Sequence, residues 1–200
     1  MSVSLRCYST SLGCPKNRVD TERLLGSLGV ALVPVESPDE AELVFINTCA
    51  FIQPATEESV RTIAQAIADI EELPKRPLLA VAGCLVGRYH AEDLAPELPE
   101  VDLWLDNSDL EAWPAMLARK LGLPEPTVPG RILSTGPSYA WLKISDGCRH
   151  ACSFCAIPNI RGGHRSHCKD MIVREARALL DQGVKELNLV AQDLTEWGCD

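Results

Sequence analysis

Three cysteines stand close together in the second half of the chain, where Cys148, Cys152 and Cys155 are separated by three and then two residues. These loop cysteines follow a strand-like run and precede a helix-like one, so we expect the segment to be a loop. Thiolates this close on a loop favour a soft metal or an iron–sulfur cluster. A four-iron cluster held by these thiolates alone would leave one iron open for a small ligand.

A structural zinc site is the alternative for the same loop, with His150, His164 or His167 as the fourth ligand. Zinc-binding sequences usually pair two short Cys/His spacings, whereas this loop has one. The spacing therefore favours the iron–sulfur interpretation, and the residues alone leave both open.

A second set, the N-terminal cysteines Cys14, Cys49 and Cys84, is spaced by 35 residues twice over, and each member follows a strand-like run. Ligands of open α/β sheets bind beyond the carboxyl ends of the strands, so thiols at three such ends can converge on one point. Cys14 also precedes a predicted helix, whose N-terminus favours a thiolate. The alternative is that all three are small buried hydrophobic residues. We expect the other cysteines not to be ligands: Cys7, Cys168 and Cys199.

The composition limits the class of protein and its compartment. The 200 residues are 46% hydrophobic and 24% charged, which is typical of a globular protein, and the net charge of −9 argues against a broadly basic nucleic-acid-binding face. We find no signal-peptide pattern, and the longest apolar run, at 78–86, is too short to span a bilayer. Nine cysteines without a secretory signal indicate a reducing compartment, so we expect a cytoplasmic protein without a membrane partner.

The elements that must position the N-terminal cysteines alternate between strands and helices. We expect strands at 3–9, 31–35, 43–46, 78–82 and 103–105, and helices at 15–28, 56–72, 88–94 and 108–121. This alternation predicts an α/β fold with an N-terminal, mostly parallel open sheet flanked by helices. Ser108 and Glu111 could form a capping box, although Pro114 favours a kink or a later start in the helix at 108–121. The expected core face of the helix at 56–72 is Val60, Ile63, Ala64, Ile67 and Ile70.

A stretch rich in proline and glycine, 122–137, predicts a linker between a first domain, 1–121, and a second domain, 138–200. The second domain contains a predicted strand at 139–145, the loop cysteines, a helix at 169–182 and a strand at 186–191. This order is one βαβ unit.

Four segments together resemble the methylthiotransferases of the radical S-adenosylmethionine class, and the similarity runs through nearly all 200 residues. They are residues 11–17 (Ser-Leu-Gly-Cys-Pro-Lys-Asn), Asn47-Thr48-Cys49, Ala82-Gly83-Cys84 and the Cys-x3-Cys-x2-Cys loop. Within the class, Cys14-Pro15-Lys16-Asn17 and Gln192-Asp193 are most similar to the branch that modifies small-subunit ribosomal protein twelve.

The resemblance implies two [4Fe-4S] clusters and S-adenosylmethionine as cofactors. The N-terminal cysteines would hold the cluster that carries the sulfur to be inserted, and the loop cysteines would hold the cluster whose open iron binds S-adenosylmethionine. Phe154 and Gln192 would contact S-adenosylmethionine, with simple packing and strand-end hydrogen bonding as the alternative roles. The paired strands around the loop would be the first βαβ unit of a radical S-adenosylmethionine barrel, a partial barrel related to the TIM barrel.

The reaction implied is insertion of a methylthio group at an unactivated carbon, most closely the β-carbon of an aspartate in small-subunit ribosomal protein twelve. The implied partners are that ribosomal protein and an electron donor such as flavodoxin or ferredoxin. A tRNA adenosine methylthiotransferase of the same class is the alternative, and a non-enzymatic zinc-binding module is a more distant one. The family continues with the rest of the barrel and a small β domain, so we expect this chain to be a fragment that is inactive alone.

Overall fold

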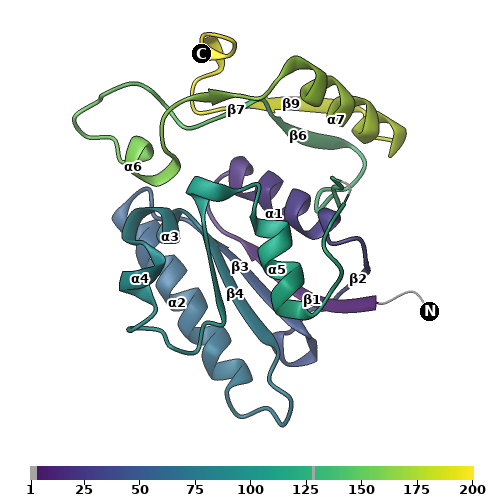
Figure 1. The fold of residues 1–200 in the computed structure, drawn as a ribbon, viewed down its shortest axis with the longest axis vertical. Coiled ribbons are helices and arrows are strands. Elements are labelled where there is room, and N and C mark those ends of the chain that lie inside the picture. The colour runs from purple at the N-terminus through teal and green to yellow at the C-terminus, as the bar shows by residue number, and fades with distance from the viewer. Residues whose placement is uncertain (1–3, 128) are drawn as a thin grey trace.

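A computed structural model describes residues 4–127 and 129–200 of the chain. Its largest element is a five-stranded parallel sheet with the strand order β2-β1-β3-β4-β5 (Figure 1). The strands are β1 (Ser4–Ser11), β2 (Ala31–Pro34), β3 (Leu43–Thr48), β4 (Leu78–Gly83) and β5 (Leu103–Asp106). This confirms the predicted parallel sheet. Val3 in the predicted first strand and Val128 in the predicted linker lie outside the described residues.

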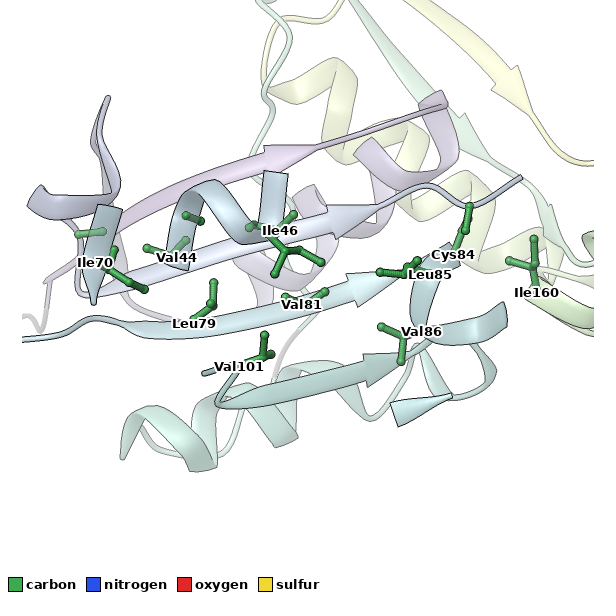
Figure 2. Packing of buried hydrophobic residues seen from close by; sticks show 14 residues of the cluster. Val44, Ile46, Ile70, Leu79, Val81, Cys84, Leu85, Val86, Val101 and Ile160 are labelled. Atoms are coloured by element: carbon green, nitrogen blue, oxygen red, sulfur yellow. The ribbon is translucent and has the colours of Figure 1, made fainter. Parts of the chain in front are cut away.

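Helices cover both faces of the sheet and enclose two apolar cores. On one face pack α2 (Gln53–Ile70) and α3 (Cys84–Tyr89), and on the other pack α1 (Pro15–Ser27) and α5 (Trp113–Leu121). Strand β3 lies between the two cores and is buried along its whole length, as its apolar sequence predicts. Figure 2 shows the first core, with Cys84 and Ile160 beyond the arrowheads of the strands.

The predicted core residues Ile63 and Ile70 of helix α2 are buried and Ile67 packs against the same core, but the buried face is shifted from the expected one. Its buried residues are Ser59, Ile63, Ala66 and Ile70. The predicted core residues Val60 and Ala64 are exposed, Val60 by 42%. The face passes through Ser59 because the Ser59 hydroxyl bonds to the backbone of Cys49.

Across the described part of the chain, no helix has both the length and the apolarity that crossing a membrane requires.

Two predicted helices are each divided in two in the structure. The one expected at 88–94 is a pair of short helices, α3 and α4 (Ala91–Leu94), separated at His90, whose φ is 61°. The one expected at 108–121 is η2 (Asn107–Asp109) followed by α5, so the late start that Pro114 favours is confirmed. The prediction of a capping box between Ser108 and Glu111 was wrong. The Asp106 carboxylate caps the turn instead, by accepting a hydrogen bond from the Ser108 amide at 2.7 Å.

The rest of the chain forms the predicted βαβ unit. Strands β6 (Tyr139–Lys143) and β9 (Glu186–Val190) pair in parallel, and α7 (Lys169–Asp181) connects them. The short strands β7 (Ser145–Asp146) and β8 (Arg165–Ser166) pair in an antiparallel way and close the base of the loop that carries the loop cysteines. That loop ends in α6 (Ile157–Arg161), which lies against α3 (Figure 1).

A buried network of charged groups joins this unit to the sheet. It consists of Lys143, Arg161, Asp20 and Asp146, whose side chains are each at most 4% exposed. The Lys143 ammonium bonds to Asp20 and, at 2.7 Å, to Asp146. The Arg161 guanidinium bonds to Asp20 at 3.2 Å and to Asp146 at 3.0 Å. Burial by itself raises the pKa of Asp146, but the charges of Lys143 and Arg161 lower it well below its usual range.

Further ion pairs run along α1 and reach into the predicted linker. Glu175 of α7 accepts hydrogen bonds from Arg23 of α1 and, at 2.8 Å, from Arg131. Arg131 also donates to Glu22 of α1 at 2.7 Å. The segment around Arg131 therefore lies against α1 although it has no regular secondary structure, and the domain boundaries expected from the sequence stay a prediction.

Replacing Gly83 by alanine should destabilise the fold more than the same change at Gly29. Gly83 has φ 98° and ψ −154°, a region open essentially only to glycine. A Cβ there would lie 2.2 Å from Oδ1 of Asn47 and 2.6 Å from the Thr48 carbonyl oxygen. Gly29 also has a positive φ, but a Cβ there meets no atom within 4 Å. We expect G29A to lower the free energy of unfolding by about 1 kcal/mol and G83A by about 3 kcal/mol or more, measured in urea. Equal losses would contradict this account.

His167 should make the fold less stable as the pH falls. Its Nδ1 lies 2.9 Å from the carbonyl oxygen of Lys143. Burial, aided by the charges of Arg23 and Lys143, lowers the pKa of His167 from 6.5 to about 4. Between these two values the unfolded chain binds a proton that the folded one does not, so stability is present above pH 6.5 and is lost as the pH falls toward 4. The loss is at most about 3 kcal/mol.

The check is the free energy of unfolding from urea titrations across this pH range. H167Q should flatten the dependence, whereas H150Q, at an exposed histidine, should keep it. An unchanged slope in H167Q would assign the acid sensitivity to other groups.

Candidate metal centre

The N-terminal cysteines lie at the carboxyl ends of three neighbouring strands, as expected from the sequence. Cys14 follows β1 and is the N-cap of α1, Cys49 follows β3 directly, and Cys84 follows β4 as the first residue of α3. Cys49 and Cys84 are 8% and 4% exposed, and Cys14 is half-buried. In a sheet with this strand order the chain changes direction between β1 and β3, and ligands bind beyond the carboxyl ends of these two strands. Cys14 and Cys49 follow those two ends, and Cys84 follows the neighbouring end of β4.

Two of these thiols affect each other's pKa. Interaction with the Cys84 thiol lowers the pKa of Cys49 to about 6, although burial opposes the shift. The same interaction, together with burial, raises the pKa of Cys84. Cys49 is therefore the readier thiolate of the two. Among the described residues none of the nine cysteines forms a disulfide.

A glycine and two polar side chains hold together the three loops that carry Cys14, Cys49 and Cys84. Gly13 has φ 83°, and a Cβ on it would lie 2.7 Å from Sγ of Cys49, so only glycine allows the approach. The Ser59 hydroxyl accepts a bond from the Cys49 amide at 3.0 Å and donates to the Cys49 carbonyl at 2.7 Å. The Asn17 amide group donates to the carbonyls of Leu12 at 2.9 Å and Thr48 at 2.7 Å.

The loop cysteines lie closer to solvent. Cys148 and Cys155 are half-buried and Cys152 is exposed. The base of the loop is closed by a hydrogen bond from the Cys148 amide to the Gly162 carbonyl at 3.2 Å, and a turn joins the Cys155 amide to the Cys152 carbonyl at 3.0 Å. The base of the loop is thus fixed by backbone hydrogen bonds, and Cys152 is its exposed thiol.

The two residues expected to contact S-adenosylmethionine differ in their surroundings. Phe154 is 91% exposed, so it does not pack in a core. Gln192 is half-buried, two residues beyond the end of β9. The carbonyl of its neighbour Ala191 accepts a bond at 3.3 Å from Lys16, which lies two residues after Cys14. The roles of Phe154 and Gln192 stay predictions.

The cysteine sulfurs of the described residues do not form a compact site for a single ion. The described residues contain one group of three or more ligand-type side chains within 4.8 Å of one another, His150, Asp193 and Glu196, and it includes no cysteine. In neither cysteine set do the three sulfurs lie so close together. A cluster of four irons is larger than one ion, so its thiolates stand further apart.

Each histidine considered as a fourth zinc ligand has one ring nitrogen with another partner in the described structure. His150 Nε2 lies 3.1 Å from Asp193, His164 Nε2 lies 3.2 Å from Ser166, and His167 Nδ1 lies 2.9 Å from a backbone carbonyl oxygen. Nδ1 of His164 is buried without a hydrogen-bond partner. The thiols at the sheet edge and on the loop fit iron–sulfur ligation.

Sequence reasoning assigned no role to several residues that shape this centre. Ser59 continues the spacing of Ile63, Ala66 and Ile70 on the buried face of α2, and a serine in an apolar series was the available signal. Asp20 and Arg161 carried no such signal, because Arg161 lies 141 residues from its partner Asp20 and 15 residues from its partner Asp146.

Comparison with known proteins agrees with the resemblance of the motifs. Residues 6–106 match the family described as "Uncharacterized protein family UPF0004". The chain is 70% identical over 193 residues to a protein of Nitratidesulfovibrio vulgaris, 63% over 193 residues to one of Oleidesulfovibrio alaskensis, and 58% over 200 residues to one of Lawsonia intracellularis. Each of these relatives is named ribosomal protein uS12 methylthiotransferase RimO.

The alignments cover 96%, 96% and 100% of this chain but 45%, 45% and 46% of the three relatives, so the chain spans about half of their length. The family match, by contrast, covers half of this chain and includes all of the N-terminal cysteines. This chain therefore belongs to the family described as UPF0004.

Proposed function

We propose that the chain is part of a radical S-adenosylmethionine methylthiotransferase that inserts a methylthio group at the β-carbon of an aspartate in ribosomal protein uS12. The observation that carries the proposal is the pair of cysteine sets, one at the switch point of a parallel sheet and one on a loop whose following helix packs against that sheet. The names of the relatives, 58–70% identical to this chain, support the same reaction.

The chain's own residues would hold and orient two cofactor sites. The N-terminal cysteines would bind one [4Fe-4S] cluster, and the loop cysteines would bind a second one that anchors S-adenosylmethionine. When bound, these groups supply one-electron cleavage of S-adenosylmethionine and the sulfur for transfer, chemistry that side chains alone cannot perform. Gln192, beyond the end of β9, and Phe154, exposed on the loop, are the proposed contacts to S-adenosylmethionine.

The strands β6 and β9 with α7 would be the first βαβ unit of the barrel that carries the second cluster. On this division, residues 1–121 form the methylthiotransferase domain, 122–137 the linker and 138–200 the start of the barrel domain. Functional groups in such barrels stand at the carboxyl ends of several strands. Gln192 fits this position because it lies two residues beyond the end of β9.

The charge of the chain favours a protein over tRNA as the partner. A net charge of −9 repels a nucleic-acid backbone, and the three relatives are all named for uS12. The tRNA adenosine reaction is the second candidate, supported by the likeness of the cysteine motifs alone. An electron donor such as flavodoxin or ferredoxin would supply the electron, and the cytoplasm is the proposed compartment.

The anaerobically reconstituted protein should hold two separable clusters. Replacing all three loop cysteines by alanine should remove about half of the iron, because the N-terminal cysteines lie on a different part of the fold. Iron and sulfide counts per chain, with the metal identified by elemental analysis, provide the measurement. Complete loss of iron in this variant, or zinc as the bound metal, would contradict the proposal of two clusters.

The cysteines outside the two sets supply matched controls. C168S and C199S, at exposed positions, should keep the iron content of the parent protein. C7S should also keep it, although a hydroxyl at this buried site should cost about 1–3 kcal/mol of stability. Iron loss in C168S would make Cys168 a ligand.

S-adenosylmethionine should perturb only the cluster on the loop cysteines. Adding it in excess to the reduced protein should change the electron paramagnetic resonance signal, because an iron without a protein thiolate is free to take a new ligand. The variant without the loop cysteines should show no change. A signal that is unaffected in the parent protein would mean that the loop cluster has no open iron.

A further inference from the structure

Arg161 belongs to the second unit by sequence but lies at the cysteine site of the first. It is the last residue of α6, the helix that follows the loop cysteines, and its side chain is 1% exposed. One guanidinium nitrogen, Nη1, bonds to the carboxylates of Asp20 and Asp146. The other, Nη2, donates to Oδ1 of Asn17 and, at 3.3 Å, to Asp20.

Asn17 connects Arg161 to the N-terminal cysteines. Its Oδ1 accepts from Arg161 and lies 3.7 Å from Sγ of Cys84. Its Nδ2 bonds to the carbonyls of Leu12 and Thr48, which precede Cys14 and Cys49 by two residues and one residue. An arginine has only donors and a carbonyl only accepts, so the amide has one orientation that satisfies both ends. The positive charge is therefore held beside the site by a fixed contact.

Backbone packing fixes the distance between the two units at this point. A Cβ on Gly87 of α3 would lie 2.4 Å from the carbonyl oxygen of Ile160, the residue before Arg161. Helix α3 begins at Cys84, and Ile160 packs in the same apolar cluster as Cys84 (Figure 2). The position of Arg161 relative to Cys84 is thus set by a close helix–helix contact in addition to its hydrogen bonds.

We propose that Arg161 is a positioning residue through which the loop unit sets the reduction potential of the metal group bound by Cys14, Cys49 and Cys84. The inference rests on the proposed function, which supplies that metal group. The buried network holds two cations and two anions and is neutral as a whole. Removing the charge of Arg161 leaves a net −1 beside Cys84 and disfavours the reduced, more negative cluster. Removing the charge of Asp20 leaves a net +1 and has the opposite effect.

The test uses the 200-residue chain with all three loop cysteines replaced by alanine, so that one cluster remains. Its midpoint potential is measured by redox titration followed by electron paramagnetic resonance, and iron is counted per chain. R161Q should make the potential more negative and D20N less negative. Each should change the equilibrium constant between the reduced and oxidised forms about tenfold, which is about 59 mV for one electron. R165Q, at an exposed arginine four residues further on, should leave the potential unchanged.

Opposite signs for R161Q and D20N separate a charge effect from structural damage, which would shift both potentials the same way. Shifts of the same sign, or no shift in variants that keep their iron, would overturn the proposal. If R161Q loses its cluster, the D20N variant still tests the proposal. A less negative midpoint potential in D20N supports the charge effect, and any other result overturns the proposal. If the parent protein holds no iron after reconstitution, that result contradicts the proposed function itself. Failure of the proposed function is therefore distinguishable from failure of the proposal on Arg161.

Discussion

The geometry of this protein depends on burying four charged groups together. Asp20, Lys143, Asp146 and Arg161 come from α1, β6, β7 and α6, and each is at most 4% exposed. Removing such groups from water costs several kcal/mol per ion unless each finds a partner of opposite charge. None of the four can stay buried if α1 moves away from the loop unit. The network therefore fixes where the loop cysteines stand relative to the sheet.

Helix α1 serves both halves of the chain because its two ends have different surroundings. Its C-terminal half buries Leu24 and Leu25 against the sheet. Its N-terminal half buries polar residues instead, since Asn17 and Asp20 face groups supplied by the loop unit. Cys14 caps the same helix, so the position of one thiol is tied to the contacts that join the two units.

The sheet topology provides the second constraint. Parallel strands in the order β2-β1-β3-β4-β5 bring three strand ends side by side, and a cysteine follows each. Close approach then requires glycine at Gly13, where a side chain would strike Cys49, and at Gly83, whose backbone turns the chain directly into α3. The same short stretches thus supply both the thiols and the backbone freedom to place them.

The sequence by itself determined the parallel α/β sheet, the βαβ unit and both cysteine sets. These follow from local signals: apolar runs such as that of β3 are complete within a few residues, and the loop cysteines lie within one loop. The apolar pattern placed Ile63 and Ile70 of α2 in the core, but tertiary structure alone decided that Ser59 is buried and Val60 exposed, because the Ser59 hydroxyl bonds to Cys49. It also decided the partnership of Arg161 with Asp20 across 141 residues. Pairing between buried charges depends on how separate elements pack, and no local pattern in the sequence encodes that.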